Sequence, residues 1–209
     1  MEIQGLIEKF TNLLYDGNKN LWKGGYPVDD KEAVYRLMEN ILEDEEIALL
    51  DIPQIDLYID QITTLIDSKL SGMCRTPNDK LLTKAMVNNY SKEKLISPTK
   101  GKKYCREQML RILMICYLKQ VLSIQDVKRI LSSFEGEEEA QHMYKLLLEE
   151  KREVAGRILA DSKQHIEASE TLKPADVVTL ILHLALLSSY AKRASEALID
   201  NLFPIDDKE

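Results

Sequence analysis

The segment 106–121 places the tightest constraint on the fold of this chain, because it is apolar on nearly every side and contains no glycine or proline. Its apolar residues are Met109, Leu110, Ile112, Leu113, Met114, Ile115 and Leu118. A helix that is apolar all round is stable only where other elements cover it. The sequence therefore predicts a central, buried helix with the rest of a helical domain packed around it.

The remaining segments also show the periodicity of helices. Apolar residues recur three and four positions apart, which places them on one face of a helix. The further helices predicted in this way cover residues 1–15, 30–42, 55–70, 83–92, 123–135, 137–169 and 174–201. A strand pattern is found only within 95–104. We therefore predict an all-α protein with one small β-ribbon.

Several features of the chain predict a cytoplasmic protein. The most apolar run, "VVTLILHLALL" at 177–187, is 11 residues long, whereas a membrane-spanning helix needs about 20, so we predict a buried core helix there. The sequence begins Met1-Glu2-Ile3-Gln4, without the basic start and apolar run of a secretory signal. The three cysteines, Cys74, Cys105 and Cys116, have no CxxC spacing, which argues against zinc sites and disulfides. We interpret Cys105 as a small apolar residue that fills space in the packing, with a redox role as the alternative.

The positive charge of the chain is gathered in one place. The net charge is −7, yet residues 80–106 contain eight lysines and arginines and a single acid, Glu93. Their balance of +7 leaves −14, that is −7 less +7, for the remainder. A patch of one sign attracts a polyanion such as a phosphate backbone. The alternative is a lysine-rich surface loop that has no partner.

The order of elements around this cluster is that of a winged helix-turn-helix, in which a short second helix enters the major groove of DNA. The short helix is 83–92, with Thr83 as its N-terminal cap. Lys84, Asn88 and Ser91 share one face, and Leu82, Met86 and Tyr90 share the other. Asparagine can pair with adenine, and lysine with guanine or phosphate.

The segment 95–104 is predicted to be the wing. Leu95-Ile96 and Lys103-Tyr104 are interpreted as its two strands, around a turn that contains Pro98 and Gly101. We expect phosphates to be contacted by the lysines of the wing, which are Lys100, Lys102 and Lys103. Arg106 and the Tyr90 hydroxyl are expected to contact them too. The full set of predicted DNA-binding residues is Thr83, Lys84, Asn88, Asn89, Tyr90, Lys92, Lys94, Lys100, Lys102, Lys103, Tyr104 and Arg106.

These residues resemble the DNA-binding domain of MerR-type transcription regulators. "MVNNYSKEKLISP", then "KKY", then "REQMLRILMICYLKQVLSIQDVKRIL" follow the order of that family's motifs. The matching positions are Tyr90, Leu95, Ile96, Pro98, Tyr104 and 123–127. Asn88, Asn89 and Lys94 stand where the family has arginine, an aromatic residue and glycine. Over about 52–134, including "IDLYIDQ" at 55–61, the chain is more similar to a bacterial family of unknown function with a MerR-like domain.

The resemblance implies a sequence-specific regulator of transcription that binds double-stranded DNA as a homodimer. Residues 51–134 are then the winged helix-turn-helix, 1–50 an N-terminal helical segment and 135–209 a helical region for dimerisation. The alternative for the last region is that its two helices pack on the N-terminal helices of the same chain. The alternative function is a winged helix that binds another protein. Whether an effector ligand exists is left open by the sequence.

No arrangement of residues typical of an active site is found in the sequence. Glu139 and His142 form one E-x-x-H motif, but a di-iron bundle needs two, and Ser162 stands three residues before His165. His183 lies in the apolar run and is interpreted as a hydrogen-bonded core histidine. Motifs for nucleotide binding and for a nucleophilic serine are absent. We therefore predict no enzyme activity, no cofactor and no metal.

Overall fold

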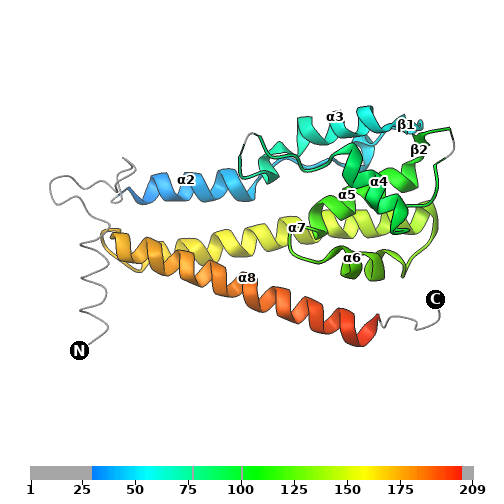
Figure 1. Cartoon of the computed structure of the whole chain (residues 1–209). Helices are drawn as coiled ribbons and strands as arrows, with labels where there is room; N and C mark the ends of the chain where they lie inside the picture. The colour runs from blue at the N-terminus through cyan, green and yellow to red at the C-terminus, as the bar shows by residue number, and fades with distance from the viewer. Residues whose placement is uncertain (1–29, 77, 100, 204–209) are drawn as a thin grey trace. The chain divides into compact units, whose positions relative to one another are not determined.

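The computed structural model describes residues 30–203, apart from 77 and 100, and this part of the chain is mostly helical (Figure 1). It divides into two compact units. Unit 1 contains residues 30–43 and 153–190, and unit 2 contains 44–152 and 191–203. The units cut across the three segments predicted from the sequence. The helix predicted over 1–15 lies outside the described residues.

Seven α-helices and two short strands are found in the described residues, which confirms the all-α class. The helices are α2 (Lys31–Leu42), α3 (Ile59–Lys69), α4 (Lys84–Lys92), α5 (Arg106–Leu118), α6 (Ile124–Leu131), α7 (Gly136–Glu167) and α8 (Pro174–Leu202). The strands are β1 (Leu57–Tyr58) and β2 (Lys103–Tyr104), and two short 3-10 helices are η1 (Leu49–Asp51) and η2 (Ser71–Met73).

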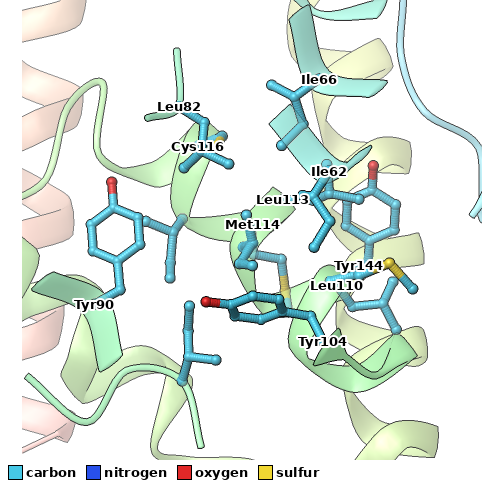
Figure 2. Packing of buried hydrophobic residues seen from close by; sticks show 14 of the residues in the cluster. Ile62, Ile66, Leu82, Tyr90, Tyr104, Leu110, Leu113, Met114, Cys116 and Tyr144 are labelled. Atoms are coloured by element: carbon cyan, nitrogen blue, oxygen red, sulfur yellow. The ribbon is translucent and has the colours of Figure 1, made fainter. Parts of the chain in front are cut away.

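Helix α5 is the centre of unit 2, as its sequence predicts. Nine consecutive residues, 108–116, are buried. Figure 2 shows side chains from α3, α4, β2 and α7 converging on Leu110, Leu113 and Met114 of this helix. Each large apolar side chain buried in this way stabilises the fold by about 1.5–3 kcal/mol. Burial also raises the pKa of the Cys116 thiol to about 12, so this cysteine is an inert part of the core.

Two polar residues of α5 are buried, and both have partners. Arg111 donates from its two terminal nitrogens to the carbonyl oxygens of Leu131 and Phe134, each at 2.8 Å, and its Nε lies 3.0 Å from Glu107 Oε1. Arg111 therefore fastens the end of α6 to the central helix. Gln108 donates from Nε2 to the carbonyl oxygen of Ser97 at 2.8 Å.

The strand pairing differs from the predicted wing. β2 pairs with β1 in antiparallel register, Leu57 opposite Tyr104 and Tyr58 opposite Lys103, and the two lie side by side in Figure 1. The predicted partner, Leu95-Ile96, is not a strand; both residues are buried. The Gln108 side chain donates a hydrogen bond to the carbonyl oxygen of Ser97, which follows them. This bond holds the segment against α5, and the segment does not pair in a ribbon. The helix predicted over 55–70 accordingly begins at Ile59, after β1.

Unit 1 is formed by α2, the second half of α7 and the first half of α8. Its buried residues are Ile166, Leu172 and Leu180, with Val34, Tyr35, Val177 and Leu184 packed against them. Lys163 of α7 forms an ion pair of 3.0 Å with Glu39 of α2. Asp30 caps α2, accepting a hydrogen bond of 3.1 Å from the Ala33 amide. In this unit α7 and α8 therefore pack with an N-terminal helix of their own chain, as one of the two alternatives expected.

The prediction that 177–187 is buried is wrong. Within this run only Leu180 is buried, whereas Ile181, Leu182, Leu186 and Leu187 are exposed. Among the described residues, α8 is the one helix long and apolar enough to cross a membrane, with a mean hydropathy of 1.4 over 18 residues. Core helices of soluble proteins meet the same two criteria, so they assign no location to the protein.

We expect Arg111→Met to lower the free energy of unfolding by about 3 kcal/mol, because two buried carbonyl groups and Glu107 lose their partner. Urea denaturation followed by circular dichroism measures this. Arg157→Met is the control, since its ion pair with Glu153 is exposed and changes there are within about 0.5 kcal/mol. Equal stability of the two variants would contradict the anchoring role.

Candidate nucleic-acid interface

Helix α4 is anchored to the core through one face. Thr83 caps it as predicted, its hydroxyl oxygen accepting a hydrogen bond of 3.2 Å from the Met86 amide. Val87 and Tyr90 are buried on the side that faces α5, together with Leu82 just before the helix. The helix is thus fixed in orientation, with its other side turned to solvent.

The outer face of α4 is polar. Lys84, Asn88, Asn89 and Lys92 are all exposed. Ser91, predicted to belong to this face, is half-buried and donates to the Val87 carbonyl at 3.2 Å. An α-helix with its side chains is about 10–12 Å across, which fits a major groove about 12 Å wide. The exposed face therefore has the size and the chemistry to contact base edges.

Helix α4 ends in a Schellman motif. The amide of Lys94 donates to the Ser91 carbonyl at 3.2 Å, and that of Leu95 donates to the Tyr90 carbonyl at 2.9 Å. Lys94 has a φ of 60°, in the left-handed region that favours glycine. The motif turns the chain sharply and buries Leu95 and Ile96 against the core.

The loop before β2 carries further exposed lysines. Gly101 and Lys102 both have positive φ, 63° and 62°, which makes a tight turn. Lys102 and Lys103 are exposed, and the Lys103 ammonium lies 5.2 Å from the ring centre of Tyr58 across the β1–β2 pair. Lys100 lies outside the described residues. The residues that anchor α4 and Tyr104, which follows the turn, belong to the same hydrophobic core.

Acidic residues of α3 partly neutralise the basic cluster. Lys84 forms an ion pair of 2.6 Å with Asp60, and Lys80 one of 2.7 Å with Asp67. The two acids are seven residues apart, about two turns of one helix face. Their spacing is visible in the sequence, but only the packing of α3 beside α4 shows which lysines they meet. Exposed ion pairs are worth about 0–1 kcal/mol, so a phosphate can compete for Lys84.

Three predicted DNA-binding residues are instead wholly or largely buried. Tyr90 and Tyr104 are 4% and 7% exposed, and burial, with the neighbouring Cys116 thiol, raises the pKa of Tyr90 to about 12. The Arg106 side chain is 13% exposed; it donates to the Leu49 carbonyl at 2.9 Å and lies 3.9 Å from Glu137. These side chains support the segments that carry the exposed lysines, but they are not themselves exposed for contact with DNA.

Residues 47–147 match a domain of unknown function, DUF1836. The match spans 101 of the 209 residues of the chain. The match covers the interface elements and almost the whole hydrophobic core of unit 2, from Ile47 to Tyr144. It agrees with the expected resemblance to a family of unknown function, and it assigns the DUF1836 domain no activity. Comparison with curated proteins and with solved structures finds no match.

We expect Thr83→Ala to lower the free energy of unfolding by about 1 kcal/mol, because the Met86 amide loses its acceptor. Thr83→Ser keeps the hydroxyl and should stay close to the wild type. Chemical denaturation of both variants measures the difference. The same loss in both would show that the methyl group of Thr83, and not its capping oxygen, stabilises α4.

Proposed function

We propose that the DUF1836 domain of this chain is a MerR-like winged helix-turn-helix that binds double-stranded DNA and regulates transcription in the cytoplasm. The observation that carries the proposal is the exposed face of α4, where Asn88 and Asn89 lie between Lys84 and Lys92 on a helix capped and anchored on its other side. The amides offer donors and acceptors to base edges, and the lysines offer charge to phosphates.

The backbone after α4 supports the MerR-like part of the proposal. MerR-type motifs have a glycine where this chain has Lys94, and Lys94 adopts the left-handed conformation that glycine favours. A left-handed residue at this position supports the proposed likeness to the motif. The turn at 101–102, with Lys102 and Lys103, takes the role of the wing, supported by β1 instead of by Leu95-Ile96.

DNA binding should depend strongly on salt. The exposed lysines of α4 and of the following turn are Lys84, Lys92, Lys94, Lys102 and Lys103. If each neutralises one phosphate, the log–log slope of affinity against salt is about −4 to −5 per half-site. We expect Lys102→Glu with Lys103→Glu to abolish binding, measured by fluorescence anisotropy on sequences enriched from random DNA.

The control is Lys145→Glu with Arg157→Glu, which changes the net charge equally at exposed sites of α7 and should bind like the wild type. Failure of the wild type to bind any DNA at low salt would end the proposal. Protein–protein binding is the alternative function, favoured by the ion pairing of Lys84 with Asp60, which lowers the positive charge of α4. Capture of a defined partner protein by the Lys102/Lys103 variant, without DNA binding by the wild type, is its signature.

We also propose that the protein is a homodimer and that α8 is the contact. Leu182, Leu186 and Tyr190 follow one another at intervals of four residues, and their exposed fractions lie between 57% and 64%. Four-residue spacing forms a ridge that packs into the groove of another helix. They lie on the side of α8 away from Val177 and Leu184, which pack inside unit 1. DNA sites with two-fold symmetry need a two-fold protein.

We expect Leu186→Glu to convert a dimer into a monomer, because a carboxylate in the centre of an apolar contact must be desolvated. Light scattering coupled to size-exclusion chromatography at micromolar concentration measures the mass. Ser188→Glu is the matched control; it is exposed and lies about 200° further round the helix. A monomeric wild type, or loss of the dimer in both variants, would argue against this contact.

A further inference from the structure

Two histidines and one aspartate meet in unit 1, between α7 and α8. Asp161 and His165 are four residues apart on α7, and His183 comes from α8. His183 Nε2 lies 2.6 Å from Asp161 Oδ2, and His165 Nδ1 lies 3.6 Å from Asp161 Oδ1. The two imidazole rings are 4.3 Å apart between centroids. One ligating atom of each side chain lies within 4.8 Å of the other two.

His165 has one ring nitrogen in a hydrogen bond and a second that can bind a metal. Its Nδ1 lies 2.9 Å from the Asp161 carbonyl oxygen, which only accepts, so Nδ1 carries the proton and Nε2 keeps its lone pair. Metal-binding histidines typically donate their second ring nitrogen to a carbonyl or carboxylate in this way. The backbone of α7 therefore already fixes the tautomer that a metal needs.

The three side chains are reachable from solvent and are not part of a sealed core. Their exposed fractions are 32% for His165, 38% for Asp161 and 37% for His183. His183 is hydrogen-bonded, as the sequence predicts for it, but its partner is an aspartate at the surface. Solvent access leaves room for an ion to enter and for water to complete its coordination.

We propose that Asp161, His165 and His183 bind a divalent first-row transition-metal ion, with Zn²⁺ as the reference ion. Two imidazoles and one carboxylate are a donor set typical of such ions, whereas Mg²⁺ and Ca²⁺ prefer oxygen ligands only. Ligands at 2.0–2.1 Å from a tetrahedral zinc are about 3.3 Å apart. The present spacing, within 4.8 Å, is wider than this, so the side chains must move closer together when the ion binds.

Binding exchanges one interaction for three. His183 Nε2 now donates to Asp161 Oδ2, so its proton moves to Nδ1 of the same ring or to solvent when Nε2 becomes a ligand. The ion then joins α7 to α8 directly. A three-residue site leaves one coordination position for water or another small ligand. This inference stands independently of DNA binding, because none of its residues belongs to the DUF1836 domain match.

The test uses the full chain, stripped with a chelator and kept under a non-chelating reductant. Zn²⁺ affinity is measured by competition with a chromogenic chelator, and Co²⁺ is added separately to read its visible absorption. His165→Gln and His183→Gln remove one ligand each, and glutamine at 183 can still donate to Asp161. His142→Gln is the matched control, since it changes the third histidine of the chain, which is exposed and apart from the cluster.

We expect the wild type and His142→Gln to bind one Zn²⁺ per chain with equal affinity. Each of the other two variants should bind at least about 100-fold more weakly, because removal of a ligand costs no less than removal of its supporting group. Zn²⁺ should raise the melting temperature of the wild type, and an excess of Mg²⁺ should not displace it. Circular dichroism of the same samples verifies folding, and Asp161→Asn replaces any variant that fails to fold.

A wild type that binds no Zn²⁺ would overturn the proposal. Wild-type affinity in either His165→Gln or His183→Gln would do so too, because the ion would then be held elsewhere, for instance by cysteines. Co²⁺ absorption that persists in both variants has the same meaning.

Discussion

The burial of α5 on every side is the constraint on which the rest of unit 2 depends. A helix whose residues 108–116 are all hidden from water needs neighbours around its whole circumference. The chain meets this need with α3, α4, α6 and the first half of α7. Because Gln108 and Arg111 are buried with them, the loops beside α5 must supply carbonyl partners at fixed places. These contacts of one helix therefore fix the end of α6 and the segment that follows α4.

Local signals predicted the parts of the fold that local chemistry decides. The Thr83 cap is set by a hydrogen bond across three residues, and it is present. The β1–β2 pair was missed because two-residue strands show no periodicity, and Leu57 and Tyr58 fit the helical pattern of the residues after them. Leu95-Ile96 has the composition of a strand. The Gln108 side chain, however, donates a hydrogen bond to the carbonyl oxygen of Ser97 beside it, and sequence patterns do not reveal a contact between residues so far apart in the chain.

The charge of the candidate interface was also only partly predictable from the sequence. Counting residues locates the basic cluster, and its lysines on α4 and on the turn at 101–103 are indeed exposed. The count overstates the free charge, because tertiary packing brings Asp60 and Asp67 against two lysines and places Arg106 in the interior. Since exposed ion pairs contribute about 0–1 kcal/mol, these acids lower the positive charge of the patch but still allow another anion to displace them. Under the proposed function, a highly charged partner such as DNA would compete for these lysines more strongly than a single small anion.

Helix α8 is where hydropathy alone is least informative, since core, partner contact and membrane span share one composition. The contacts of its apolar half add a chemical argument on the proposed dimer contact. His183 lies against Asp161 of α7, and the helix also carries Lys192, Arg193, Glu196 and Asp200 in its second half. A charged residue at the centre of a bilayer costs about 2.5–3.5 kcal/mol or more. Lipid around α8 would have to accommodate the Asp161 carboxylate as well, whereas a second protein helix can pack on Leu182 and Leu186 and leave the His183–Asp161 side in water. The proposed dimer contact on Leu182 and Leu186 is therefore compatible with a solvated His183–Asp161 pair.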